Sequence, residues 1–176
     1  MFISMEHEMK RTILFVILFL MFGINIYADT TSNLFVIERS KNANIVSYDA
    51  VLTDDGKINE KKPVDSYWLL YAYKNGEREE LSAFDKKAYG FKVKYNAEGQ
   101  NFDFVLNAAK DKPMVIDLYD GVTKAVMKIN NVDCFLEKVY IGSVDGAFGI
   151  PNVSFYELFG KEVKTGEAQQ QKIVVK

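Results

Sequence analysis

Short runs of β-branched and aromatic residues recur along the chain at near-regular intervals, with turn residues between them. They predict ten strands, over residues 34–38, 45–52, 66–73, 91–95, 102–107, 114–119, 124–129, 134–143, 153–159 and 171–175. The residue pairs Asn75-Gly76, Glu98-Gly99, Asp120-Gly121, Asn130-Asn131, Asp145-Gly146 and Thr165-Gly166 supply the positive φ values of tight turns. This pattern is typical of an all-β, antiparallel sandwich or barrel of about 8–10 short strands.

Alternation within the runs predicts which strands are buried. In "FKVKY", the apolar side chains Phe91, Val93 and Tyr95 share one face, while the lysines occupy the other, as in a half-buried strand. The runs "LFVIE" and "YWLLYAY" are apolar on both faces, which places them near the centre of the fold.

One short helix is expected over residues 83–89. Ser82 and Asp85 have the spacing of a capping box, in which each side chain bonds the backbone of the other. Phe84 and Ala88 fall on one helical face. We expect this helix to lie across the sheet or to close one end of a barrel.

The N-terminus carries the pattern of a secretory signal peptide. Two cations precede an apolar run over residues 13–23, and small or neutral residues follow as far as Ala28. The run is shorter than the ~20 residues that span a bilayer. We expect a signal peptide over 1–28, a single β-rich domain over 29–176, and a periplasmic or secreted protein with no stable membrane span after cleavage. A retained N-terminal anchor stays open as the alternative.

Removal of the expected signal peptide would limit the catalytic and metal-binding chemistry available to the protein. His7 is the one histidine of the chain and lies in the expected signal peptide. The mature protein then lacks the imidazole of His-based nucleophile activation and of common zinc sites. The single cysteine, Cys134, forms no intramolecular disulfide, and alternation with Leu136 and Tyr140 predicts that it is buried. No metal site, cofactor or catalytic residue is expected.

The charge of the chain does not indicate a nucleic-acid partner. Its formal net charge is −2, with the two signs interspersed. A near-neutral domain of this kind has no basic footprint for nucleic acid or an anionic membrane.

Polar residues between the first two predicted strands form one candidate site. Arg39, Lys41, Asn42 and Asn44 lie there with Ser40. The simpler interpretation is a hairpin turn, with Asn42 or Asn44 in the left-handed conformation and Ser40 bonded to nearby backbone. The alternative is a rim of donors for an anionic or sugar ligand.

An aromatic run forms the second candidate site. Alternation in "SYWLLYAY" places Tyr67, Tyr71 and Tyr73 on one face and Trp68 on the other. Such residues build either the core or a stacking surface for a ligand. Because aromatic side chains dominate buried area, we expect these residues to belong to the core. Trp68 is the residue whose environment distinguishes a core role from a ligand-binding role.

The chain resembles a bacterial family of exported proteins, domain of unknown function 4833. The resemblance is carried by "LFVIERSKNANIVSYDA", "PVDSYWLLY", "KKAYGF" and "IPNVSFYELFGKEVKTGE", in that order. It implies an exported β domain and brings no catalytic residue with it.

The function expected from these observations is binding without catalysis. The ligand would be a small apolar molecule or a glycan, or the partner would be an envelope protein. One alternative is a carboxylate-dependent glycan hydrolase, since paired acids need no histidine. Another is a purely structural envelope protein.

Overall fold

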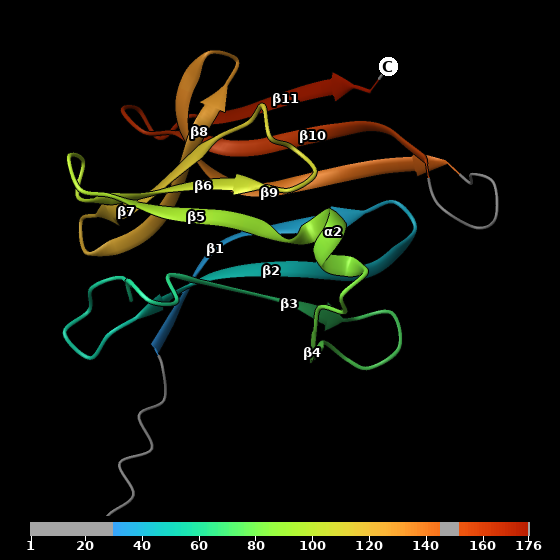
Figure 1. The fold of residues 1–176 in the computed structure, drawn as a ribbon. Helices are drawn as coiled ribbons and strands as arrows, with labels where there is room; N and C mark the ends of the chain where they lie inside the picture. Colours follow the sequence, from blue (N-terminus) through green and yellow to red (C-terminus); the bar gives the residue numbers. More distant parts are fainter. Residues whose placement is uncertain (1–29, 145–151, 176) are drawn as a thin grey trace, which may run out of the picture.

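The computed structural model describes residues 30–144 and 152–175. The expected signal peptide and the Asp145-Gly146 turn lie outside these residues, so export stays a prediction. Within the described chain, eleven strands form one curled sheet, a half-barrel (Figure 1). The all-β class is therefore confirmed, and the sheet is neither two separate layers nor a closed barrel.

The strands are β1 (Thr30–Arg39), β2 (Asn42–Leu52), β3 (Val64–Leu70), β4 (Glu77–Glu80), β5 (Phe91–Asn96), β6 (Asn101–Leu106), β7 (Met114–Tyr119), β8 (Val122–Ile129), β9 (Val132–Val144), β10 (Asn152–Glu162) and β11 (Ala168–Val174). All ten predicted strands are present. The eleventh, β4, was missed because its sequence "EREE" is fully exposed and has no apolar residue to alternate.

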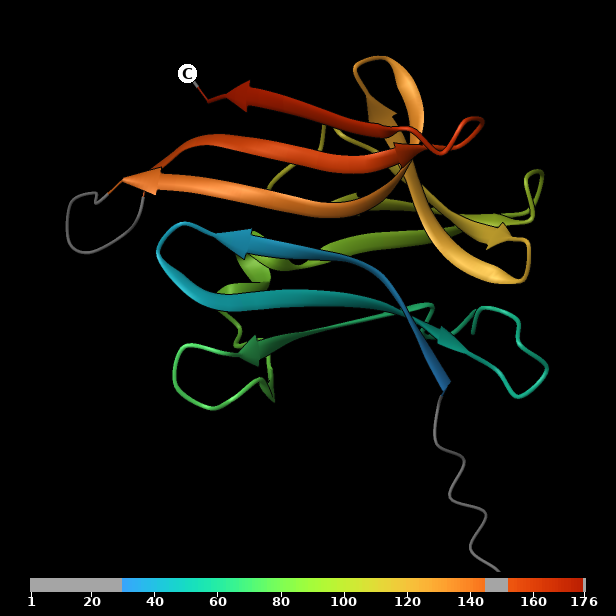
Figure 2. The same ribbon diagram turned by 180° about the vertical axis from the view of Figure 1, so that it is seen from behind.

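The sheet branches at the long strand β9. One edge of β9 pairs first with β8 and then with β1, and β10 runs along the other edge. From this point one branch continues through β8, β7, β6 and β5, and the other through β1, β2, β3 and β4. Figure 2 shows β9, β10 and β11 side by side, in orange to red, above β1 and β2. The β1–β9 pair is parallel, which is the one exception to the antiparallel arrangement predicted.

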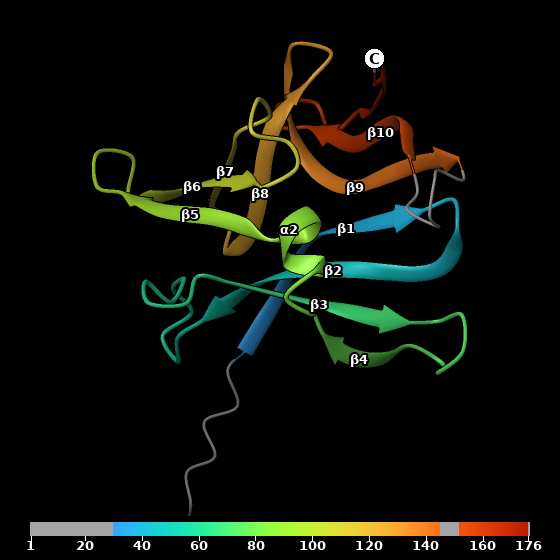
Figure 3. The same cartoon turned by 45° about the vertical axis from the view of Figure 1, so that its right-hand side comes forward.

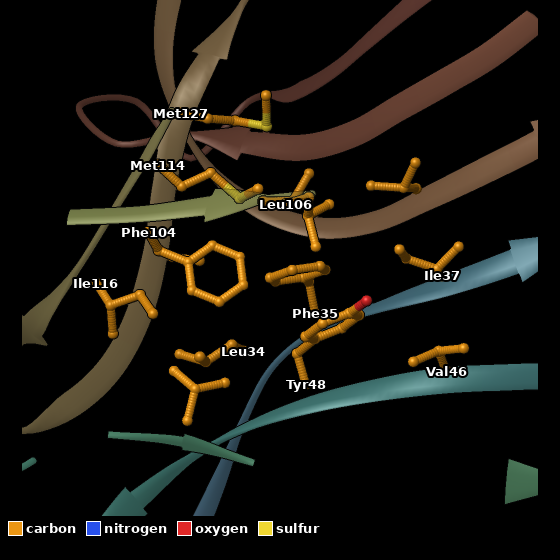
Figure 4. Close-up of a cluster of buried hydrophobic side chains, with 14 of the residues drawn as sticks. Leu34, Phe35, Ile37, Val46, Tyr48, Phe104, Leu106, Met114, Ile116 and Met127 are labelled. Atoms are coloured by element: carbon orange, nitrogen blue, oxygen red, sulfur yellow. The ribbon is translucent and has the colours of Figure 1, made fainter. Parts of the chain in front are cut away.

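Aromatic side chains fill the space where the two branches face each other. The ring of Phe35 stacks on Tyr48 with centroids 4.5 Å apart, and Phe104 meets Phe35 edge-on at 6.0 Å. Phe91 and Phe104 belong to the same branch and stack on each other at 4.9 Å, and Tyr48 of the opposite branch meets Phe91 edge-on at 6.2 Å. Figure 4 shows Phe35, Tyr48 and Phe104 together with the aliphatic side chains around them. Such pairs add to the free energy of burial, and they hold the branches together.

The predicted turns are mostly correct. Asn75-Gly76, Asp120-Gly121 and Asn130-Asn131 each have positive φ at both residues. The last two pairs are two-residue hairpin turns, whereas Asn75-Gly76 ends the longer connection from β3 to β4. The Glu98-Gly99 prediction is wrong in its detail, because Gln100 carries the positive φ in that turn.

A bulge in β9 changes which side chains face inward. Cys134 and Leu136 are buried, as predicted. The pairing of β9 with β10 then shifts register between Phe159 and Gly160, where β9 carries one extra residue. An extra residue reverses the alternation. Val139 is therefore the next buried position, and the inward placement predicted for Tyr140 is wrong.

The one helix in the described chain, α2 (Asp85–Tyr89), is shorter than the 83–89 predicted. The capping box is present: the Asp85 backbone N–H donates to Ser82 Oγ at 3.1 Å, and the Ser82 backbone N–H donates to Asp85 Oδ2 at 3.1 Å. Phe84 and Ala88 are exposed and do not pack into the core. No helix among the described residues is long and apolar enough to cross a membrane.

Candidate ligand-binding site

A cavity of about 470 Å³ lies beneath α2, at the end of the half-barrel where the β1–β2 turn and the C-terminus also lie (Figure 1). It is formed where the branches separate at β9, between the end of β1 and the loop that joins β6 to β7. The described residues that line it are Ile37, Arg39, Lys41, Phe84, Asp85, Ala88, Tyr89, Leu106, Ala108, Ala109, Lys112, Met114, Met127, Val139, Ile141, Ser143, Val153, Tyr156, Leu158 and Val175.

The cavity wall is mostly aliphatic. Ile37, Met127, Val139 and Leu158 are buried there and present only carbon and sulfur to the space. The other part of the interior holds stacked aromatic rings, so the change from aromatic to smaller aliphatic side chains coincides with the cavity. Figure 3 shows α2 between the two branches. Phe84, the residue just before α2, is 71% exposed and belongs to the lining, so the apolar lining extends to the surface.

Charged groups are few and mainly positive. Among the described lining residues, Arg39, Lys41 and Lys112 are cationic and Asp85 is the acid. Lys112 contacts Asp111 at 3.8 Å, in an ion pair that is largely exposed. The cavity therefore combines an apolar interior with an excess of positive charge.

Arg39 is the most constrained of these cations. Its guanidinium carbon lies 4.4 Å from the centroid of the Trp68 ring and 6.0 Å from that of Tyr89. Trp68 and Tyr89 meet edge-on at 5.2 Å, so the two rings form a corner around the guanidinium. The Nη2 group of Arg39 donates to Asn42 Oδ1 at 3.0 Å. The Nε of Arg39 is buried and has no hydrogen-bond partner among the described residues.

Asp85 is held in place by the capping box and by Trp68. Partial burial favours the neutral acid, but hydrogen bonds from Ser82 and from the Trp68 side chain, together with the positive charge of Arg39, hold the pKa of Asp85 below its usual value. The carboxylate is thus charged at neutral pH and is already engaged by neighbouring donors.

Residues 35–172 match the family described as Domain of unknown function (DUF4833). The chain belongs to this family. The match covers both branches of the sheet and all but the last residues of β11. No curated protein and no solved structure matches the chain significantly.

The first predicted site residues of this DUF4833 domain do form a hairpin, but not as expected. The turn is Ser40–Lys41, and neither Asn42 nor Asn44 has a positive φ. Ser40 bonds a distant strand and not nearby backbone: its Oγ accepts from the Ser143 backbone N–H at 3.0 Å. The hairpin is thereby fixed to the end of β9, where Ser143 lines the cavity.

The structure separates the four predicted residues of this hairpin. Arg39 and Lys41 line the cavity. Asn42 supports Arg39 through the hydrogen bond described above. Asn44 is buried, and its Oδ1 accepts from the Ala72 backbone N–H at 2.8 Å, which secures the chain after β3. Asn44 therefore has a structural role and does not line the cavity.

The aromatic run of the DUF4833 domain is also divided. Trp68 is buried at 6% exposure and is part of the core, as expected, while it also supports Arg39. Tyr67 lies on the opposite face of β3. The predicted strand over 66–73 ends at Leu70, so Tyr71 and Tyr73 sit in the following turn, where both are exposed. The alternation did not reveal this end, because the apolar pattern continues into the turn.

A polar network occupies the outer face around Tyr67. Its hydroxyl donates to Asp49 Oδ2 at 2.6 Å, and Asn33 and Ser47 donate to Asp49 Oδ1 at 2.8 and 2.9 Å. Burial and the Asp49 carboxylate both raise the pKa of Tyr67. Asp49 is only 5% exposed, so these three donors compensate for its loss of water. The Asp49 carboxylate thus has hydrogen-bond donors for both of its oxygens, so we assign this network a structural role.

A second hollow, of about 310 Å³, brings two carboxylates near each other. Asp65 and Glu80 line it, and one Arg78 nitrogen donates to Asp65 at 2.8 Å and to Glu80 at 3.1 Å. Burial opposes charge on Asp65, but hydrogen bonds from Arg78 and Lys62 hold its pKa below the usual value. A glycosidase acid needs a raised pKa, and the lowered pKa of Asp65 is the opposite of this requirement.

Several cavity residues were not singled out from the sequence. Met114 and Met127 belong to predicted strands, and only the three-dimensional branching of the sheet brings them to the cavity. Ala109 and Lys112 come from the loop after β6, where small and charged residues resemble any exposed turn. Among the described residues, no cluster of acids, cysteine or histidine is arranged to hold a metal ion.

Proposed function

We propose that this protein binds a small, mostly apolar molecule in the cavity beneath α2, without transforming it. The observation that carries the proposal is the cavity itself. Its volume of about 470 Å³ falls within the ~300–1,000 Å³ typical of small-molecule sites. An apolar ligand that enters it is favoured by about 25 cal/mol for each Å² removed from water.

The composition of the lining favours an apolar ligand over a glycan. A glycan needs several hydrogen-bonding groups arranged around its hydroxyls. The wall is built mainly from groups such as Ile37, Met127, Val139 and Leu158, and its polar groups are concentrated at the charged residues and Ser143. A glycan would leave many of its hydroxyls without partners inside this cavity, which is unfavourable.

A glycan hydrolase and a purely structural envelope protein, the two alternatives to a binding function, have less support. The cavity lining contains one acid among its described residues, Asp85, whose pKa is lowered, so a pair of catalytic carboxylates is not formed there. A purely structural role gives no reason for an apolar cavity that reaches the surface beside the exposed Phe84.

Binding of the neutral fluorescent dye Nile red tests the proposal. We expect saturable binding with increased dye emission, because the dye moves from water into an apolar site. Ile141→Phe should weaken binding, since Ile141 lines the cavity and is half-buried, so a larger ring there occupies ligand space. Leu118→Phe is the matched control, because Leu118 is exposed on β7 outside the cavity. Equal binding by both variants, or no saturable binding by the parent protein, would contradict the proposal.

A further inference from the structure

We propose that the ligand is an amphiphile with an anionic head group, a carboxylate or a phosphate ester, which binds Arg39 while its apolar chain fills the cavity. This inference rests on the proposed function and specifies its ligand class. It follows from how Arg39 is placed and from the balance of charge around the cavity.

Arg39 lies at the end of β1 with Ile37 in the lining just before it, so the guanidinium sits where the apolar wall meets the strand end. The guanidinium carbon of Arg39 lies 4.4 Å from the centroid of the Trp68 ring and 6.0 Å from that of the Tyr89 ring. This contact orients the side chain without using its N–H groups. The guanidinium is therefore positioned before a ligand arrives, which lowers the entropy lost on binding.

The hydrogen bonds of Arg39 leave donors available. The Oδ1 of Asn42 accepts a hydrogen bond from Arg39 Nη2, and Arg39 Nε is buried without a partner among the described residues. A buried N–H without an acceptor costs free energy, and an anionic oxygen would remove that cost. Two oxygens of one carboxylate or phosphate match the fork of a guanidinium, which makes Arg39 suited to either head group.

The surrounding charges favour an anion. Lys41 and Lys112 line the same cavity, while the Asp85 carboxylate already accepts hydrogen bonds from Ser82 and Trp68. No carboxylate of the described chain lies within ion-pair distance of Arg39. Because the interior is apolar, the attraction between Arg39 and an anionic head group is less weakened by water than at an open surface.

The head group is tested with four probes that share one chain: dodecanoate, dodecyl phosphate, dodecanol and dodecyltrimethylammonium, each used below its micelle concentration. Trp68 is the one tryptophan of the chain and contacts Arg39, so its emission reports binding directly. We expect dodecanoate, dodecyl phosphate or both to bind about tenfold or more tightly than dodecanol, as charge-assisted hydrogen bonds imply. The cationic probe should bind most weakly.

Variants assign the effect to Arg39. Arg39→Gln should remove the preference for the anionic probes and leave dodecanol binding nearly unchanged. Arg78→Gln is the matched control, because Arg78 also stacks on an aromatic ring, at 3.8 Å from Tyr67, but lies outside the cavity lining. Arg39→Lys, which keeps the charge and loses the fork, should give an intermediate preference and provides the test if Arg39→Gln does not fold.

The outcomes separate the two proposals. Equal affinity for dodecanoate, dodecyl phosphate and dodecanol, unchanged by either Arg39 variant, would overturn the anionic head group while the apolar site remained. Failure of all four probes to bind, together with failure of Nile red, would overturn both. Tighter binding of the anionic probes that Arg78→Gln reduces as much as Arg39→Gln would also overturn the assignment.

Discussion

Each face of β3 carries an arginine stacked on an aromatic ring, but the two arginines have different surroundings. Tyr67 and Trp68 are neighbours in sequence and point to opposite faces of the strand, and each lies beneath an arginine. Arg78 covers Tyr67 at 3.8 Å on the outer face, and Arg39 covers Trp68 at 4.4 Å on the inner face. Both contacts are cation–π interactions of ordinary geometry.

The difference lies in what neutralises each guanidinium. Arg78 donates to Asp65 and Glu80, and its side chain is 45% exposed. Arg39 donates to the neutral amide of Asn42, beside an apolar cavity. Arg78, whose charge is paired with two carboxylates of the same chain, needs no ligand to balance it. A stacked arginine with a neutral partner and a buried donor without a partner among the described residues fits the anion-binding role that we propose for Arg39. The stacking alone does not distinguish them.

The largest effect on this comparison is expected from Trp68→Ala. Trp68 is buried in the core cluster, and removing so large a side chain should lower the free energy of unfolding by about 3–5 kcal/mol. Urea unfolding followed by circular dichroism measures the loss. A variant about as stable as the parent would show that the inner face tolerates a void there, and Trp68 would then be a ligand contact more than a core residue.

A smaller effect is expected from Tyr67→Phe on the outer face. This change keeps the ring beneath Arg78 and removes the hydroxyl that donates to Asp49 at 2.6 Å. Since Asp49 is buried and keeps its bonds from Asn33 and Ser47, we expect a loss of about 1–2 kcal/mol.

Tyr67→Phe also tests the separation of the two faces, because it should leave Nile red binding unchanged. Weaker dye binding by this variant, at equal folded fraction, would show that the outer network is coupled to the cavity.

The fold class was accessible from the sequence because period-two alternation and turn pairs are local signals. Asp120-Gly121 and Asn130-Asn131 specify their hairpins through the backbone conformations they allow. The branching of the sheet was not accessible. It depends on β9 continuing beyond its hairpin with β8 to pair with β1, and no local pattern records a pairing between strands so far apart in the sequence.

The candidate site was predictable only in part, for the same reason. Arg39 and Lys41 were selected as polar residues beside a strand, and both line the cavity. Asn44 belonged to the same local pattern, yet its amide binds the backbone of Ala72, which is distant in sequence. Exposed and buried polar residues at a strand end look alike until the neighbouring loops are placed around them.

The smallest effect, and the most specific to the inner face, is expected from Asp85→Asn. The pKa of Asp85 is lowered in the folded protein, relative to an unfolded value of about 3.9. A lowered pKa contributes stability that is fully present above the unfolded value and is lost as the pH falls through the folded value. Asp85→Asn lacks this contribution, so it should be less stable than the parent near neutral pH.

The difference between Asp85→Asn and the parent should shrink as the pH falls below about 4, because protonation then removes the same charge from the parent. Thermal unfolding of both proteins across this range measures it. Asp103→Asn, on an exposed position of β6, is the control, and it makes no hydrogen bond or ion pair through its side chain among the described residues. A stability difference for Asp85→Asn that stays constant with pH would mean that the carboxylate charge is not what Ser82, Trp68 and Arg39 stabilise. The inner face would then depend on the shape of Asp85 and not on its charge.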